Sequence, residues 1–112
     1  MSGNVQRIIA PDYPGAFLDW RVGSGRTIEI FDIHVPNEYR RMGVGRAMMS
    51  QLLASVPPEA TVWAITRTEN RMAQEWYTAM GFHVTAALYE FYDSGCGRVD
   101  ALMFGRRASG AV

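Results

Sequence analysis

The sequence predicts an α+β fold in which a mixed α/β sheet begins as an antiparallel meander and continues as a β-α-β-α-β-β series. Two observations support this class. Short apolar stretches bounded by glycine and proline are typical of strands, and two later stretches repeat apolar residues at helical spacing. With 112 residues, 48% of them hydrophobic, the chain is long enough for one core. We therefore expect a single domain over residues 1–112.

Three strands are expected at residues 5–9, 16–22 and 27–35. Prolines at positions 11 and 14 and a glycine at position 15 mark the first turn, and Gly23-Ser24-Gly25 marks a second, tighter one. Pro36 and the two residues after it end the third strand. Strands joined by connections this short pair antiparallel, so this part of the chain is predicted to form the meander.

A first helix is expected at residues 47–56. Its apolar face is formed by residues at helical spacing, namely Val44, Met48, Leu52 and Val56. Pro57 and Pro58 stop this helix, because proline has no backbone N–H for the helical ladder. A short buried strand follows at residues 61–66, and the connecting helix makes it parallel to the strand before it.

A second helix is expected at residues 70–80, followed by a hairpin of strands at 82–91 and 99–104. The helix carries apolar residues at helical spacing: Ala73, Trp76, Tyr77 and Met80. Trp76 is expected in the core, and Gly81 suits the left-handed position that follows a helix. Residues 106–112 are expected to form a polar, flexible tail.

The single cysteine, Cys96, lies in the expected hairpin turn. One cysteine excludes an internal disulfide and fits a reducing cytoplasm, and an incidental loop thiol is favoured over a catalytic one. A formal net charge of 0 argues against broad electrostatic binding to nucleic acid or membranes. Because no stretch has the length of a membrane span or the form of a signal peptide, we expect a cytoplasmic protein. No metal site is expected.

The most informative segment is Arg-Arg-Met-Gly-Val-Gly-Arg at residues 40–46, between an expected strand and an expected helix. Backbone N–H groups at a helix start have no intrahelical partner, and the helix dipole adds positive potential there. Gly43 and Gly45 lack the Cβ atoms that would hold a phosphate away from those amides. With three arginines nearby, the segment predicts a pyrophosphate site. It matches neither a dinucleotide loop, whose third glycine is replaced by Met48, nor a P-loop, which requires lysine.

The pattern Arg40-x-x-Gly43-x-Gly45 after a hydrophobic strand resembles the acyl-coenzyme A loop of the GNAT N-acetyltransferase superfamily. Residues 70–82 are similar to the family's later motif, N-x-x-A-x-x-x-Y-x-x-x-G-F. The matching residues are Asn70, Ala73, Tyr77, Gly81 and Phe82. The resemblance extends from residue 28 to about residue 104. It implies a GNAT-like acyl-CoA N-acyltransferase fold, with acetyl-CoA as the acyl donor.

The resemblance also implies how acetyl-CoA binds. The pantetheine arm would enter between two splayed parallel strands and pair with backbone at residues 33–35, while the pyrophosphate would reach the arginine loop. The expected cofactor-binding residues are Ile33, His34, Val35, Arg40, Arg41, Met42, Gly43, Val44, Gly45, Arg46, Asn70, Ala73 and Tyr77. Asn70 has an alternative role, because asparagine is also a common helix N-cap.

The implied chemistry is direct attack of a primary amine on the acetyl-CoA thioester in a ternary complex. Tyr77 matches the family's general acid toward the coenzyme A sulfur; the alternative is a tyrosine packed in the core. Glu29 is the leading candidate for the general base, expected to share an apolar strand face with Phe31 and Ile33. His34, with Asp32 beside it on the opposite face, is the alternative base.

The acceptor side departs from the family. Members usually begin with a strand and two helices that wall the acceptor site, whereas only residues 10–15 separate the first two strands here. We expect an open acceptor side or a homodimer that covers apolar surface around Ile8, Phe17 and Trp20. The acceptor is a protein lysine or N-terminus, or a small amine such as a polyamine or aminoglycoside. The alternative function is a non-catalytic acyl-CoA-binding or protein-interaction module.

Overall fold

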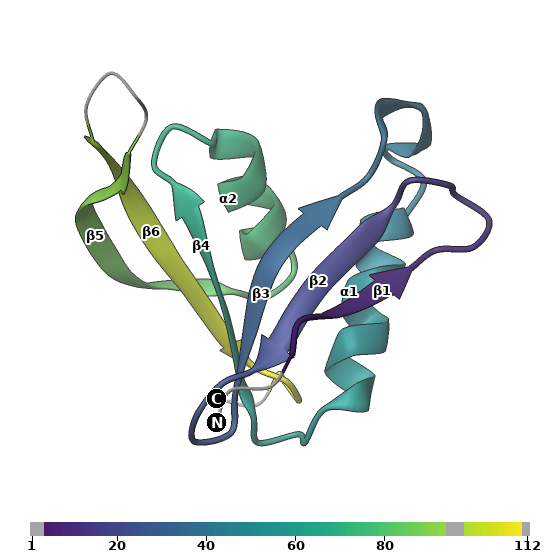
Figure 1. The fold of residues 1–112 in the computed structure, drawn as a ribbon, viewed down its shortest axis with the longest axis horizontal. Helices are drawn as coiled ribbons and strands as arrows, with labels where there is room; N and C mark the ends of the chain where they lie inside the picture. Colours follow the sequence, from purple (N-terminus) through teal and green to yellow (C-terminus); the bar gives the residue numbers. More distant parts are fainter. Residues whose placement is uncertain (1–3, 94–97, 111–112) are drawn as a thin grey trace. The chain divides into compact units, whose positions relative to one another are not determined.

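The computed structural model describes residues 4–93 and 98–110 (Figure 1). The elements in chain order are β1 (Gln6–Ile9), β2 (Phe17–Val22), β3 (Thr27–His34), the 3₁₀ helix η1 (Asn37–Tyr39), α1 (Val44–Ser55), β4 (Thr61–Arg67), α2 (Arg71–Ala79), β5 (His83–Asp93) and β6 (Arg98–Arg107). The strands belong to one six-stranded sheet in the order β1-β2-β3-β4-β6-β5. This mixed sheet with two α-helices confirms the predicted fold class.

The described residues form two compact units. One runs up to Val62 and also includes the residues from Arg107 onward, and the other runs from Trp63 to Arg106. In the first unit β1 pairs antiparallel with β2, and β2 with β3, which confirms the predicted meander. Helix α1 packs against β1 and β2. Its apolar face fills the core of this unit, which includes Ile8, Leu18, Ile28, Ile30, Val44, Met48, Met49 and Leu52.

Helix α1 begins at Val44, three residues before the predicted start. The reason is Gly43, whose backbone is left-handed at φ 77° and which serves as the N-cap. At its other end the helix stops at Ser55, just ahead of the two prolines, as predicted. The glycine-containing segment therefore lies partly in the first turn of the helix rather than wholly in a loop.

The apolar surface expected to pair with a second subunit is largely covered within the first unit. Ile8 is buried against the core, and Phe17 and Trp20 are half-buried. Register explains this result, because Ile8 lies opposite the fully buried Leu18 in the β1–β2 pair. The exposed apolar side chains near this sheet edge are instead Val5 and Ile9.

The second unit contains α2 and the β5–β6 hairpin. The two strands pair antiparallel from His83↔Gly105 to Asp93↔Arg98, which confirms the predicted hairpin. The predicted turn, including Cys96, lies outside the described residues. Tyr77, Met80, Phe82, Ala101 and Phe104 are buried in this unit. Trp76, which was predicted to be core, is only half-buried.

The C-terminal segment differs from the flexible tail that was expected. Strand β6 continues to Arg107, and the N–H of Ala108 donates to the carbonyl oxygen of Ala60 at 2.9 Å. The N–H of Ser109 donates to the carbonyl oxygen of Pro58 at 3.0 Å. The expectation of a flexible tail was based on the polar side chains of this segment. The segment is held by backbone hydrogen bonds, which the side chains do not indicate.

Candidate active site

The arginine loop, which is the segment of residues 40–46, follows β3 and η1 and runs into α1, all within the first unit. No side chain among the described residues caps α1, and its first turn holds no acidic residue. The first helical hydrogen bond runs from the N–H of Ala47 to the carbonyl oxygen of Gly43, at 2.9 Å. The N–H groups of Val44, Gly45 and Arg46 precede that bond and have no helical partner. They form the end of a helix dipole that favours an anion.

The space in front of this helix start is open. A Cβ atom added to Gly43 would meet no described atom within 4 Å outside its chain neighbours. Arg40, Arg41 and Arg46, which are close to Gly43 in the sequence, are all exposed. Arg41 has a left-handed backbone with φ 64°, a conformation that costs a residue with a side chain about 1–2 kcal/mol. Such strain is typical of functional loops.

Arg40 ties the loop back to the end of β3. Its Nε donates to the carbonyl oxygen of Val35 at 3.2 Å, and its backbone N–H donates to the carbonyl oxygen of Asn37 at 3.2 Å. The Val35 carbonyl, which was expected to pair with pantetheine, thus already accepts one hydrogen bond. A carbonyl oxygen has two lone pairs and can accept a second.

A β-bulge in β3 changes which side chains share a face. Asp32 lies opposite Asp19, but the next pair is Ile30 with Trp20, so Phe31 is an extra residue in β3. Directly opposed residues share a face. The register therefore places Glu29, Asp32 and His34 on the same side, together with Arg21, Asp19 and Phe17 of β2.

The predicted assignment of faces was therefore wrong. We expected Glu29 to share a face with Ile33 and to lie opposite Asp32 and His34. Ile33 instead pairs with the buried Leu18, on the side that faces the core. Strict alternation fails here because the extra residue shifts every side chain after it to the other face. Both candidate bases consequently lie on one sheet face.

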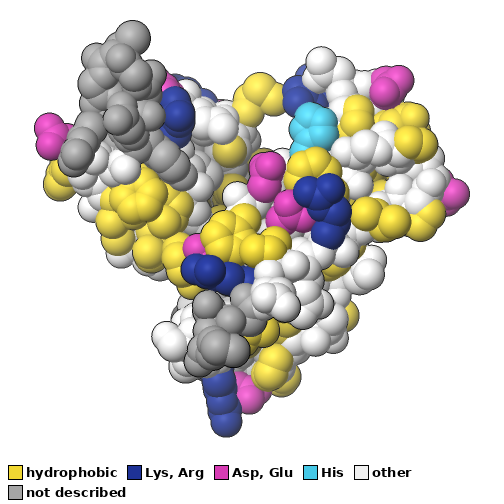
Figure 2. Space-filling model, viewed as in Figure 1, with side chains coloured by type: hydrophobic (Ala, Val, Ile, Leu, Met, Phe, Trp, Pro, Cys, Tyr) yellow, Lys and Arg dark blue, Asp and Glu magenta, His cyan; other side chains and the backbone are white. Residues whose placement is uncertain are grey.

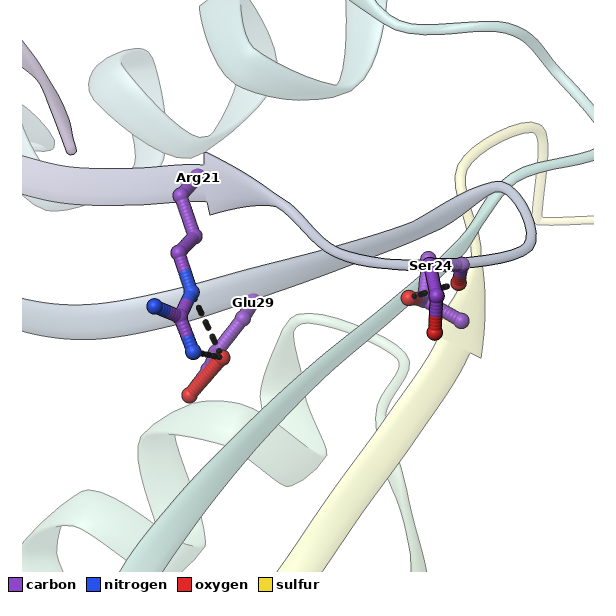
Figure 3. A network of polar contacts seen from close by, with 4 residues as sticks. Arg21, Ser24 and Glu29 are labelled. Atoms are coloured by element: carbon purple, nitrogen blue, oxygen red, sulfur yellow. Dashed lines mark hydrogen bonds and ion pairs between the residues drawn. The ribbon is translucent and has the colours of Figure 1, made fainter. Parts of the chain in front are cut away.

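Glu29 is held by an arginine of the neighbouring strand (Figure 3). Nε and Nη2 of Arg21 donate to the same carboxylate oxygen, Oε1, at 3.1 and 2.9 Å. The Glu29 side chain is 16% exposed. The Arg21 guanidinium also lies 4.7 Å from the ring centroid of Phe31, a cation–π distance. The carboxylate thus has a charged partner, whose guanidinium lies over an aromatic ring, rather than the purely apolar surroundings that were expected.

His34 lies at the exposed end of β3. Its ring centroid is 5.7 Å from that of Phe17. The Arg7 guanidinium in turn lies 4.0 Å from the centroid of the Phe17 ring. Within the described part of the chain, no ion pair joins His34 to Asp32. Figure 2 shows basic, acidic and hydrophobic side chains interspersed on one face of the molecule, with a histidine among them.

Arg7 and Asp19 form a bidentate ion pair on the sheet face that bears Glu29 and His34. Nε and Nη2 of Arg7 donate to Oδ1 and Oδ2 of Asp19 at 2.7 and 2.9 Å. The hydrogen bonds from Arg7 hold the pKa of the Asp19 carboxyl below its ordinary value. Asp19, with a smaller contribution from Asp32, raises the pKa of the Arg7 guanidinium in return. Reasoning from the sequence missed three residues that contribute charges to the face of Glu29 and His34, namely Arg7, Asp19 and Arg21.

The second motif begins at the N-terminus of α2. The Oδ1 atom of Asn70 accepts the N–H of Ala73 at 3.1 Å, so Asn70 is the N-cap of this helix. This confirms the alternative role given for Asn70. Both residues were also predicted to bind the cofactor, and the structure already uses this oxygen and this N–H for the cap.

Tyr77 is packed in the second unit and is only 5% exposed. Its ring stacks on Phe104 at 5.8 Å and meets Trp76 and Phe82 edge-on, each at 5.2 Å. The ring is thereby fixed in one orientation, which is a requirement for a positioned acid as well as a property of a core residue.

The candidate residues fall into the two units. The first holds Glu29, His34 and the loop with its helix start, and the second holds Asn70, Ala73 and Tyr77. Within the described residues, no group of three or more His, Cys, Asp or Glu side chains could hold a metal ion. No helix in the described ranges is long and apolar enough to cross a membrane.

The chain is thus an α+β protein in which an uncapped helix start follows a glycine- and arginine-rich loop, an arrangement that favours an anion. The signature of the acetyltransferase (GNAT) family matches residues 9–82, and the chain belongs to this family. This confirms the resemblance seen in the two motifs.

The relatives agree with this membership. The ribosomal protein bS18-alanine N-acetyltransferase of Escherichia coli (strain K12) is 32% identical over 76 residues, which cover 66% of this chain and 51% of that protein. The chain thus spans about half the length of the curated relatives it matches. The crystal structure of the ribosomal-protein-S18-alanine N-acetyltransferase from Escherichia coli aligns with a TM-score of 0.72 at 29% identity, over 87% of this chain and 63% of that one. The structure of smu.2055 from Streptococcus mutans shares the fold, with a TM-score of 0.76 at 24% identity, over 91% and 68% of the two chains.

Proposed function

We propose that this protein is an N-acetyltransferase that moves the acetyl group of acetyl-CoA to a primary amine in a ternary complex. The observation that carries the proposal is the start of α1. Among the described residues its first turn has no side-chain cap and no acidic residue, a Cβ added to Gly43 would meet no described atom within 4 Å, and the arginines at positions 40, 41 and 46 are exposed. A pyrophosphate satisfies such a site. Family membership makes coenzyme A the pyrophosphate compound that fits best.

We infer that Glu29 is the general base and Tyr77 the general acid. The amine nitrogen attacks the thioester carbonyl carbon, and its proton passes to the Glu29 carboxylate. The tetrahedral intermediate then collapses, the C–S bond breaks, and the departing sulfur takes the proton of the Tyr77 hydroxyl. The products are an amide and free coenzyme A. Because Arg21 occupies Oε1 of Glu29, the proton would go to Oε2.

His34 remains the competing base. It shares the Glu29 face and is more exposed. Glu29 is favoured because its position in the strand ahead of the loop matches that of a glutamate base in protein-acetylating members of the family. The cofactor-binding roles of the other residues rest on the same resemblance, with the pyrophosphate at residues 40–46 and pantetheine at residues 33–35.

We propose a protein N-terminal amine as the acceptor. The Escherichia coli relative is named as an alanine N-acetyltransferase of a ribosomal protein, and an alanine in a protein has an amine only at the N-terminus. The face that bears Glu29 also suits a peptide, because Phe31 is 45% exposed and Asp32 and His34 are exposed beside it. A lysine side chain or a small amine is the alternative acceptor. A cytoplasmic location follows from a ribosomal-protein acceptor and from the single cysteine.

A homodimer is a further part of the proposal. The exposed Val5 and Ile9 lie at the β1 edge of the sheet, where an unpaired strand invites a partner. Light scattering should give about twice the 12.5 kDa mass of the chain, and Ile9→Asp should return the monomer. A mass of 12.5 kDa over a wide range of concentrations would contradict the dimer.

Thiol release from acetyl-CoA, measured against a panel of amines, tests the proposed function. The panel contains a peptide with a free N-terminal alanine, the same peptide with a blocked N-terminus and one lysine, a polyamine and an aminoglycoside. We expect release above background with the first peptide. Calorimetric binding of acetyl-CoA without release in any mixture would instead identify the non-catalytic module.

A further inference from the structure

The turn between β1 and β2 contacts the segment that leads into the arginine loop. Ile9 at the end of β1 pairs with Phe17 at the start of β2, and Phe17 pairs with His34 at the end of β3. The turn at residues 10–15 and the segment after His34 therefore leave the sheet at the same end. Both belong to the first unit.

Two contacts join the turn to this segment. The ring of Tyr13 meets that of Tyr39 in η1 edge-on, with centroids 5.3 Å apart and an interplanar angle of 70°. At Gly15, whose φ is +91°, an added Cβ would lie 3.2 Å from Cγ of Pro36. A side chain at this position would be strained by the positive φ and would require the Pro36 ring to shift, so glycine is favoured where the turn approaches the segment.

The turn and η1 are each closed by two backbone hydrogen bonds, and in η1 these are Tyr39 N–H to the carbonyl oxygen of Pro36 at 2.9 Å and Arg40 N–H to that of Asn37 at 3.2 Å. The N–H of Tyr13 donates to Ala10 at 2.9 Å, and the N–H of Ala16, a buried residue, donates to Tyr13 at 3.1 Å. Helix η1 has three residues and none of them is buried. A short 3₁₀ segment of this kind is weakly stable in isolation. Its aromatic contact with the turn thus adds to the restraint that its own backbone hydrogen bonds provide.

Tyr39 directly precedes Arg40, and Arg40 in turn bonds the Val35 carbonyl oxygen. A change in the position of Tyr39 is therefore passed to the loop that carries the strained Arg41 backbone and leads into α1. A loop that is already in its binding conformation pays less ordering entropy when the ligand arrives. When the competent conformation is only fractionally populated, the apparent Kd rises in proportion.

We propose that the turn at residues 10–15 is a brace for the arginine loop, and that Tyr13 and Gly15 are positioning residues for acetyl-CoA affinity. This inference rests on the proposed function. The brace acts through the conformation of the loop and touches neither the thioester nor the amine. It sets the affinity for acetyl-CoA, and it leaves the rate of the chemical step unchanged.

The test compares Tyr13→Ala with Tyr13→Phe in the full chain. Calorimetry measures the Kd of acetyl-CoA, and steady-state assays separate KM for acetyl-CoA from kcat. For Tyr13→Ala we expect Kd and KM to rise about 2- to 10-fold, the range that an edge-to-face aromatic pair supplies, with kcat unchanged. Tyr13→Phe keeps the aromatic edge and should restore wild-type affinity.

The matched control is Tyr89→Ala in β5, which removes a tyrosine that is 80% exposed and belongs to the other unit. It should leave Kd unchanged. If Tyr13→Ala fails to fold, Tyr13→Leu keeps the apolar bulk without the ring and should show the same rise. If folded Tyr13→Ala or Tyr13→Leu binds acetyl-CoA with the same Kd as the wild type, the brace is overturned and the proposed function is not. A folded wild-type chain that does not bind acetyl-CoA overturns the proposed function, and the brace with it.

Discussion

The carbonyl oxygen of Tyr77 accepts the N–H of Phe82 at 3.0 Å, and the rings of these two residues lie 5.2 Å apart. Together with the N–H of Gly81, which donates to Thr78 at 3.0 Å, this closes α2 with a Schellman motif. The motif that ends the helix thus also holds Tyr77, both by its backbone and by its ring. The Tyr, Gly and Phe of the family motif form one structural unit.

Gly81→Ala should destabilise the protein by about 1–2 kcal/mol, because residue 81 has φ 86° and a side chain there is strained. The added Cβ would also lie 3.1 Å from Nη1 of Arg106, which donates a hydrogen bond to the carbonyl oxygen of Met80 and would have to shift. Chemical denaturation gives the free energy of unfolding. An unchanged value would show that the cap does not limit the stability of this helix.

Tyr77→Phe should lower kcat about 10²-fold and leave acetyl-CoA affinity nearly intact. Phenylalanine keeps the ring contacts with Phe82 and Phe104, so the packing of the core is retained. Single-turnover kinetics should show that the chemical step has slowed. A folded variant with an unchanged chemical step would make Tyr77 a core residue only.

Gly45→Glu should abolish acetyl-CoA binding while thermal stability is kept or raised. An acidic residue in the first turn of a helix interacts favourably with the dipole, yet it repels the pyrophosphate. Gly45→Gln is the control, since it adds nearly the same bulk without charge and should weaken binding less. If calorimetry gives Gly45→Glu the wild-type affinity for acetyl-CoA, the pyrophosphate does not bind at this helix start.

Glu29→Gln should lower kcat and flatten the acidic limb of the pH–rate profile, because the group that accepts the proton no longer titrates. His34→Gln is the comparison from the same sheet face and should preserve that limb. Glutamine can still accept the hydrogen bonds of Arg21, so the strand should keep its arrangement. The reverse pattern in the two profiles would make His34 the base.

Asp19→Asn should reduce the pH dependence of stability in acid. Arg7 lowers the pKa of Asp19 from its ordinary value of 3.8 in the folded state. A depressed folded pKa means that the stabilisation is present above the unfolded pKa and is lost as pH falls through the folded one. The free energy of unfolding should therefore be higher for the wild type than for Asp19→Asn near neutrality, and this difference should shrink from about pH 5 downward. Arg7→Met should remove the same pH dependence of the free energy of unfolding. A difference between the wild type and Asp19→Asn that stays constant down to pH 2 would contradict this prediction.

The order of elements and both motifs could be predicted from the sequence, because they depend on local signals. Helical spacing, the two prolines after α1 and the glycine at position 81 each act within a few residues. The N-cap role of Asn70 is of the same kind. Each of these signals agreed with the structure to within a few residues at the ends of the elements.

The faces of β3 could not be predicted, because they depend on pairing with β2. The sequence Ile-Glu-Ile-Phe-Asp-Ile-His at residues 28–34 fits either an unbroken strand or a bulged one. Only the register with β2 shows that Phe31 is the extra residue. The Arg21–Glu29 pair and the burial of Ile8 arise from the same long-range pairing. The ordered residues after β6 depend on backbone hydrogen bonds, which side-chain patterns do not report.

Acetyl transfer to a peptide with a free N-terminal alanine, followed by mass spectrometry, tests the central claim most directly. Wild-type protein with acetyl-CoA should add one acetyl group, which fragmentation should place on the α-amine, and Gly45→Glu should add none. Unmodified peptide after prolonged incubation with folded, acetyl-CoA-bound protein would contradict an N-terminal acceptor. Absence of modification on every amine of the panel would contradict the assignment as an acetyltransferase.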